Sequence, residues 1–212
     1  YEMLVPASWV NEIIENDNNG KPYKIFEVSW GEVSEDYLNG HIPGAVHINT
    51  DDVEEGPVWN RKSDEELEQF ALDYGITHDT TVILYGADPM GSYRVAVILK
   101  YMGVEDVRVL NGGWAAWVNA GFEIETEEHE KEPVESFGVP VPSNPNYIVD
   151  LEEAKQILAD KGSTLVDIRT WEEYIGETSG YDYIEPKGRL SGAVWGRAGS
   201  DPYHLEDYRN LD

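Results

Sequence analysis

Apolar residues along the chain follow two spacings that alternate. Short runs of β-branched and aromatic residues predict strands over residues 24–29, 45–48, 80–85 and 107–110. Between these runs, apolar positions three and four apart predict helices over residues 8–15, 64–74, 94–101 and 114–120. Ser8, Ser63 and Ser92 are the expected N-cap residues of three of them. Strands that alternate with helices in this way predict an α/β fold, a parallel sheet with helices on both faces.

The same pattern starts again after an acidic, proline-rich segment. Residues 125–135 hold six Glu and one Lys, and prolines punctuate the stretch up to Pro145. This composition is typical of a linker. Beyond it we predict a helix over 151–158, a strand over 164–168 and a helical turn over 171–174, and Gly188–Val194 matches Gly40–Val46 in character. The chain therefore contains an internal repeat of about 140 residues. We predict a domain over 1–124, a linker over 125–145 and the truncated start of a second domain over 146–212.

Charge and composition narrow the function classes. The 212 residues include 42 acidic and 15 basic side chains, for a net charge of −27. A field of this sign repels nucleic-acid phosphates and anionic lipids, and no apolar run is long enough to cross a bilayer, so we expect neither nucleic-acid binding nor membrane insertion. The absence of cysteine excludes disulfides, thiolate metal ligands and a cysteine nucleophile within these residues. Because the chain starts at Tyr1 with no signal segment, we expect a processed product or a fragment, and the compartment stays open between cytoplasmic and exported.

Four motifs of the first domain occur in a characteristic order. They are Phe26–Val28, the turn Gly40–Val46, the strand Val82–Tyr85 with its loop, and the run Val104–Trp117. Together they resemble a rhodanese-homology domain, and Leu165–Arg169 with Trp171–Tyr174 and Gly188–Val194 resembles the opening half of another. The resemblance implies a tandem or multi-domain thiosulfate sulfurtransferase. Such enzymes pass the outer sulfur of thiosulfate or a related donor through a cysteine persulfide to a thiophilic acceptor, and no cofactor is expected.

In that family the cysteine lies in the loop after the strand equivalent to Val82–Tyr85, where backbone N–H groups and a helix N-terminus favour anions. Here the nucleophile position is Gly86 when counted from the strand end, or Pro89 when counted back from Arg94 as the loop arginine. Neither side chain can attack sulfur. Asp88 would oppose an anionic substrate, and Ser92 has no adjacent base. The loop Gly86-Ala87-Asp88-Pro89-Met90-Gly91-Ser92 is therefore predicted to be vestigial, and we favour a structural turn over a small-molecule site.

Basic residues of the second repeat are the remaining candidates. Arg169 follows a predicted strand, at the edge where parallel sheets place their sites, and in the family an arginine there can face the active site. An ion pair of Arg169 with Glu172 or Glu173 is the competing interpretation. Arg189 precedes the Gly-rich run Trp195–Ser200 and Arg197 lies within it, and both are candidate contacts for thiosulfate or sulfonate oxygens in the complete protein.

Two histidines of the first domain are the candidates for metal ligands. His41 and His47 are six residues apart with no carboxylate at ligand spacing, so we predict no metal site.

Two functions of different classes follow from this sequence. In the first, the chain is the catalytically silent N-terminal part of a sulfurtransferase that acts on a small-molecule donor and acceptor. In the second, it is a non-enzymatic module that uses the same scaffold to bind a protein partner or a sulfur carrier. A cysteine phosphatase is excluded by the same missing nucleophile. Because half a sheet leaves an open edge and an uncovered apolar face, we also expect the second domain to pack on other surfaces or to self-associate.

Overall fold

The computed structural model describes residues 3–160 and 162–196. Its contacts divide the chain into two compact units, Tyr1–Ile148 and Val149–Asp212, which are described separately. The strands of the first unit are β1 (Leu4–Val5), β2 (Tyr23–Ser29), β3 (Val46–Asn49), β4 (Glu54–Glu55), β5 (Asn60–Arg61), β6 (Thr81–Tyr85) and β7 (Asp106–Leu110). Its α-helices are α1 (Ala7–Glu15), α2 (Glu35–Asn39), α3 (Asp64–Asp73), α4 (Pro89–Met102) and α5 (Gly113–Ala120), and short 3₁₀ turns cover Asp17–Gly20, Thr50–Asp52 and Pro145–Tyr147.

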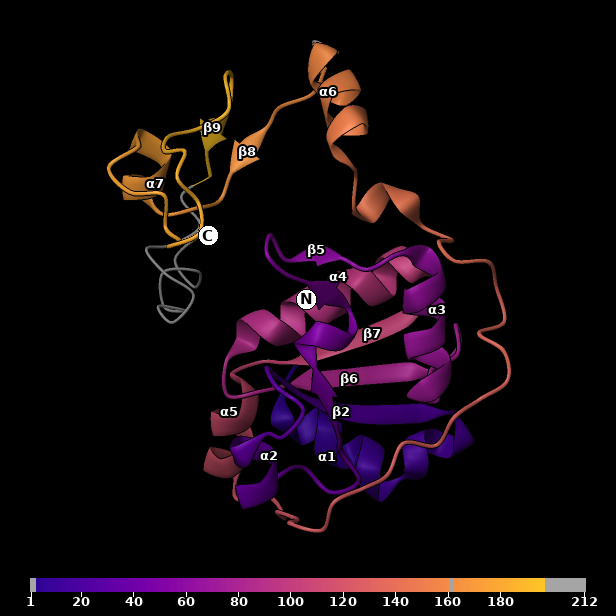
Figure 1. Cartoon of the computed structure of the whole chain (residues 1–212). Helices are drawn as coiled ribbons and strands as arrows, with labels where there is room; N and C mark the ends of the chain where they lie inside the picture. The colour runs from indigo at the N-terminus through magenta and orange to yellow at the C-terminus, as the bar shows by residue number, and fades with distance from the viewer. Residues whose placement is uncertain (1–2, 161, 197–212) are drawn as a thin grey trace. The chain divides into compact units, whose positions relative to one another are not determined.

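Five strands of this unit form one parallel sheet in the order β1-β7-β6-β2-β3. Its inner strands β7, β6 and β2 lie side by side in Figure 1. The central strand β6 is buried along its whole length, since β2 and β7 pair with its two edges. A parallel strand covered on both faces needs a continuous apolar run, and Thr81–Tyr85 provides one. The predicted α/β fold with a parallel sheet is confirmed.

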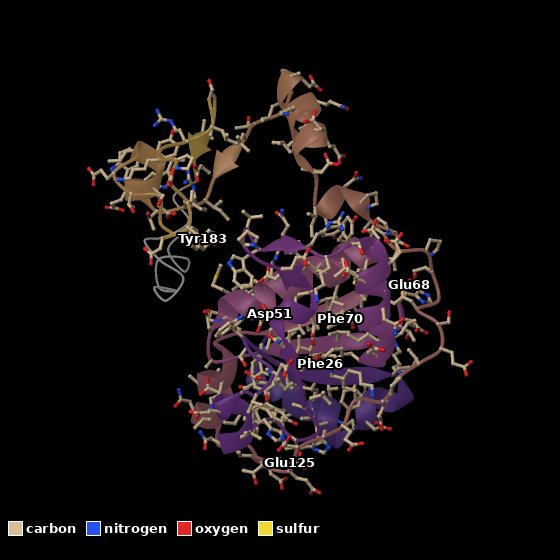
Figure 2. The ribbon with its side chains drawn as sticks, viewed as in Figure 1. Phe26, Asp51, Glu68, Phe70, Glu125 and Tyr183 are labelled. Atoms are coloured by element: carbon tan, nitrogen blue, oxygen red, sulfur yellow. The ribbon has the colours of Figure 1, made fainter. Side chains whose placement is uncertain are left out.

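Helices cover both faces of the sheet, and alternate strand residues point to each. Phe26 of β2 and Leu84 of β6 pack with α3 and α4, in one apolar cluster that includes Phe70 (Figure 2). Ile25 and Ile83 face the other way and pack with α1 and α5 in a second cluster. The period-2 alternation of a strand is the cause, because successive side chains project to opposite faces.

Helix starts differ from the expected caps at two of three positions. Ser63 caps α3 in a full capping box with Glu66, as predicted. Helix α1 instead begins at Ala7 after Pro6, so Ser8 lies inside its first turn. Helix α4 begins at Pro89 with Asp88 as its N-cap, which places Ser92 within the helix. In α4, proline at the first helical position explains why the helix starts before Ser92. Its fixed φ suits the helix, and its missing N–H is not needed there.

The segment after α5, expected to be a linker, lies along the first unit. The amide of Val134 donates to Leu72 O at 2.9 Å, and the amide of His78 donates to Phe137 O at 2.9 Å. The Phe137 side chain is 1% exposed and belongs to the main apolar cluster. One buried aromatic side chain and these backbone hydrogen bonds attach an otherwise acidic segment to the domain, and the first compact unit runs to Ile148.

The described part of the second unit contains α6 (Leu151–Ala159), β8 (Val166–Asp167), α7 (Trp171–Ile175) and β9 (Val194–Trp195). Strands β8 and β9 pair in parallel, as β2 and β3 do. The repeat extends to side chains: Tyr37 donates to Ala45 O at 2.8 Å, and Tyr174 donates to Ala193 O at 3.1 Å. Ala193 is the only buried apolar residue among the described residues of this unit. No helix in the described parts of the chain is long and apolar enough to cross a membrane.

Candidate functional site

The loop predicted to be vestigial follows β6 at the carboxyl end of the sheet. Tyr85 ends the strand, and its buried hydroxyl accepts a hydrogen bond from the amide of Ile42 at 3.0 Å. Burial raises the pKa of the Tyr85 phenol well above its usual value. The phenol next to the loop is therefore neutral and structurally engaged, and it supplies no base.

Gly86 is enclosed by backbone on two sides. A β-carbon placed on it would lie 2.4 Å from the carbonyl oxygen of Val28, at the end of β2. Its own carbonyl accepts a hydrogen bond from the amide of Trp114 at 3.1 Å, at the start of α5. Gly113, with φ +54°, has no β-carbon to meet that carbonyl, which would lie 2.5 Å away. Only glycine fits at position 86 without a backbone shift.

The N-terminus of α4 is already occupied by a carboxylate of the chain. Asp88 Oδ1 accepts a hydrogen bond from the amide of Met90 at 2.8 Å, and Pro89 has no N–H to offer. Two of the groups that would otherwise form an anion cradle are thereby satisfied or missing. Ala87, Asp88 and Met90 are exposed, so the loop is an open turn rather than an enclosed site.

The last two candidates of the loop point away from a shared centre. Ser92 is fully buried, and its hydroxyl has no hydrogen-bond partner among the described residues. Arg94 donates from Nε to Glu54 Oε2 at 2.8 Å and from Nη2 to the carbonyl of Trp59 at 3.2 Å. Arg94 thus anchors the β4–β5 hairpin through its side chain. Gly91 packs closely, since a β-carbon there would lie 3.3 Å from Val28 Cγ1.

Arg169 of the second unit is paired with Asp167. Its Nε and Nη2 donate to the two carboxylate oxygens at 3.0 and 2.7 Å, and Nη2 also donates to Gly188 O at 2.8 Å. The guanidinium hydrogen bonds lower the pKa of Asp167. An ion pair was therefore correctly anticipated, but its partner is Asp167 rather than Glu172 or Glu173.

Arg189 lies over the ring of Tyr174 at 4.4 Å. With Arg169 it lines a cavity of about 480 Å³ inside this unit, whereas Arg197 lies outside the described residues.

The first unit contains two histidine–carboxylate clusters that spacing in the sequence does not predict. In one, His47 Nδ1 lies 2.7 Å from Glu27 Oε2, and His47 Nε2 lies 2.8 Å from Gly31 O. Burial alone would lower the pKa of His47, but the hydrogen bonds to Glu27 and Gly31 outweigh it and raise that pKa. Adjacent strand positions in the β2–β3 register, not sequence spacing, bring Glu27 and His47 together.

The second cluster joins His41 to Glu125 and His129, whose ligand-type atoms all lie within 4.8 Å of one another. An antiparallel bridge between His41 and Glu125 holds these segments in place. His129 and His47 also line a cavity of about 730 Å³ with Tyr37, Tyr74 and Lys131. The only sequence signal for this cluster is the four-residue spacing between Glu125 and His129.

Comparison with known proteins agrees with the parallel sheet and its motifs. The Rhodanese-like domain family matches residues 7–120, which is more than half of the chain. The chain belongs to this family. Thiosulfate sulfurtransferase YnjE of Escherichia coli is 46% identical over the whole chain, and the match covers 50% of that relative. Thiosulfate sulfurtransferase of Bos taurus is 29% identical over 92% of the chain, and Sulfur carrier protein TtuD of Thermus thermophilus is 35% identical over 89%.

Solved structures extend the rhodanese likeness to nearly the full length. The crystal structure of YnjE aligns with a TM-score of 0.90 at 45% identity, covering 98% of this chain and 51% of the other. Wild-type EanB aligns with a TM-score of 0.89 at 43% identity, covering all of this chain and 53% of the other. Further EanB structures contain hercynine or ergothioneine. The chain thus spans about half the length of YnjE and of EanB.

Proposed function

We propose that this chain is the non-catalytic part of a multi-domain rhodanese sulfurtransferase. In this proposal the first unit is a silent rhodanese domain and the second is the beginning of another such domain. The observation that carries the proposal is the loop after β6. Of its two candidate nucleophile positions, Pro89 has no nucleophilic side chain, and the surroundings of Gly86 exclude any side chain. Relatives named thiosulfate sulfurtransferases support thiosulfate as the class of sulfur donor in the complete protein.

The charge of the same loop also supports the proposal that it is not catalytic, because it disfavours bound anions. Asp88 places a carboxylate at the N-terminus of α4, the position that would stabilise a thiolate or a thiosulfate anion. The remaining hydroxyl, Ser92, is buried inside the helix and has no base beside it. The first unit therefore has neither a nucleophile nor a free anion cradle in this loop.

A thiosulfate:cyanide sulfurtransferase assay tests the proposal. The purified chain should release no thiocyanate above the buffer rate, while full-length YnjE, assayed in parallel, serves as the positive control. The Ser92→Ala variant should behave like the parent chain. Thiocyanate release that scales with protein concentration and survives repurification would contradict catalytic silence, and its loss in Ser92→Ala would assign it to this hydroxyl.

A binding module is the second candidate function, because one relative is named a sulfur carrier protein. The two functions differ in what the complete protein must contain. A sulfurtransferase needs a cysteine in a loop at the carboxyl end of another rhodanese sheet, whereas a binding module does not. Mass spectrometry of the complete protein after incubation with thiosulfate separates them: a persulfide adduct supports the enzyme, and its absence supports the module.

The second unit exposes apolar side chains that contacts with other protein surfaces would cover. Large apolar side chains of this unit are exposed, among them Leu151 at 67%, Ile168 at 69% and Leu190 at 65%. Monomeric proteins rarely leave such a set uncovered. We propose that this face is covered in the complete protein and that the isolated chain self-associates through it. Sedimentation velocity should show a concentration-dependent increase in mass, and a monomer across the accessible concentrations would contradict self-association.

A further inference from the structure

The cluster of His41, Glu125 and His129 contains ligand atoms of the kind that a transition metal needs. His129 Nε2 lies 3.0 Å from Glu125 Oε2, and the ligand-type atoms of all three side chains lie within 4.8 Å of one another. Zinc binds imidazole nitrogen and carboxylate oxygen at about 2.0–2.2 Å, which places neighbouring ligand atoms about 3.0–3.5 Å apart. The His129–Glu125 pair already has this separation, and a shift of about 1 Å in partly exposed side chains brings the third ligand into range (Figure 2 labels Glu125).

Both ring nitrogens of His41 lie at hydrogen-bond distance from backbone carbonyls. His41 is fully buried, with Nδ1 2.8 Å from the Tyr37 carbonyl and Nε2 3.1 Å from the Glu127 carbonyl. A neutral imidazole has one N–H and can donate to only one of them. Metal binding through Nε2 requires Nδ1–H to donate to the carbonyl of Tyr37, and it requires the ion to displace the carbonyl of Glu127 from Nε2. A backbone carbonyl that holds the other ring nitrogen is the usual support of a metal-bound histidine.

His129 gives a second, independent indication. Its Nε2 atom is buried and makes no hydrogen bond of acceptable geometry among the described residues, although Glu125 Oε2 lies 3.0 Å away. Two ligands of one metal approach each other in this manner, because each points at the ion and not at the other. Glu125 Oε2 is itself oriented by the amide of Gly44 at 2.8 Å.

We propose that His41, Glu125 and His129 form a binding site for one divalent transition-metal ion of the zinc type. Two imidazoles and one carboxylate favour Zn²⁺ over Ca²⁺ or Mg²⁺, which require mainly oxygen ligands. The cavity beside His129 leaves room for water to complete the coordination. The ion would join the turn at His41 to residues 125–129, and so attach the acidic segment to the domain.

Zinc titration of the tag-free, EDTA-treated chain tests the site at about pH 7.5, where free imidazole is mostly neutral. Isothermal titration calorimetry should give one equivalent of bound Zn²⁺, and an excess of Ca²⁺ or Mg²⁺ should not displace it. Glu125→Gln and His129→Asn should each weaken binding by about tenfold or more. His78→Asn is the matched control, because His78 is a half-buried histidine of the same unit that bonds only to the Phe137 carbonyl. Its affinity should equal that of the parent chain.

Unfolding midpoints separate loss of a ligand from loss of the fold. Without metal, His129→Asn should unfold at the same temperature as the parent chain, since its side chain is 35% exposed. Added Zn²⁺ should raise the midpoint of the parent and of His78→Asn, but not that of His129→Asn. Three results would overturn the site: no one-equivalent binding, equal affinity in His129→Asn and His78→Asn, or displacement by Ca²⁺.

Discussion

Replacing His47 with alanine would leave a buried carboxylate without its main partner. Glu27 is 3% exposed, and its Oε2 accepts hydrogen bonds from His47 at 2.7 Å and from Ser29 at 3.2 Å. Its Oε1 has no hydrogen-bond partner among the described residues. His47→Ala therefore reduces the carboxylate to the weak contact with Ser29, and it also removes the donor to the carbonyl of Gly31.

The loss of unfolding free energy in His47→Ala depends on the carboxylate of Glu27, which stays buried without its partner. Removal of one partner from a buried ion pair costs about 3–5 kcal/mol, because the other charge stays desolvated and unpaired. With a urea m-value of about 1–3 kcal/mol/M, the unfolding midpoint should fall by about 1–5 M. His47→Gln can keep one of the two hydrogen bonds, so it should cost about 1–2 kcal/mol less than alanine. Urea unfolding followed by tryptophan fluorescence measures both variants.

The pH dependence of stability provides a second readout. The pKa of His47 is raised in the folded state, since the hydrogen bonds to Glu27 and Gly31 outweigh burial, with a smaller contribution from the charge of Asp52. Stability from this pair is therefore fully present below the unfolded histidine pKa of about 6.5, and it is lost as pH rises through the folded value. The parent chain should lose this contribution toward alkaline pH, and His47→Gln should not. A cost below about 1 kcal/mol for alanine, or identical pH profiles, would refute the reasoning.

Two further substitutions test the packing of the first unit, both by urea unfolding. Gly86→Ala should destabilise the chain by about 1–3 kcal/mol, because its β-carbon would lie 2.4 Å from the Val28 carbonyl oxygen; an unchanged midpoint would mean that the loop has room for a side chain. Phe137→Ala should cost about 3–5 kcal/mol, since the side chain is 1% exposed within the main cluster; a cost below about 1 kcal/mol would show that residues 125–148 are held only loosely.

Long periodic segments were predictable from the sequence, whereas several two-residue strands were not. The run Thr81–Tyr85 is apolar enough to identify the central strand by itself. Strands β1, β4, β5 and β9 have two residues each, too few for any periodicity to appear. The start of α4 did have a signal, Asp88 followed by Pro89, which is a typical N-cap and first-turn pair.

The side-chain contacts that the sequence did not predict join residues that are far apart along the chain. Residues 125–145 were predicted to be a linker from their average composition, which is acidic and rich in proline. The single buried side chain of Phe137 hardly alters that average. His41 meets Glu125 only because an antiparallel bridge forms across the domain. Glu27 meets His47 through strand register, which depends on the whole sheet. The missing cysteine, in contrast, needed no structure, since chemistry excludes persulfide formation without a thiol.

The packing of the loop after β6 bears on the proposed catalytic silence beyond the identity of one side chain. A cysteine at position 86 would have to move the backbone of β2 or of the loop itself, because its β-carbon would lie 2.4 Å from the carbonyl oxygen of Val28 and 3.1 Å from that of Asp88. Its thiolate would then lie near the carboxylate of Asp88, and a like charge raises a thiol pKa. Pro89 would still provide no N–H for an anion. Close packing around Gly86 at the end of the sheet therefore supports the proposal that this loop does not bind thiosulfate.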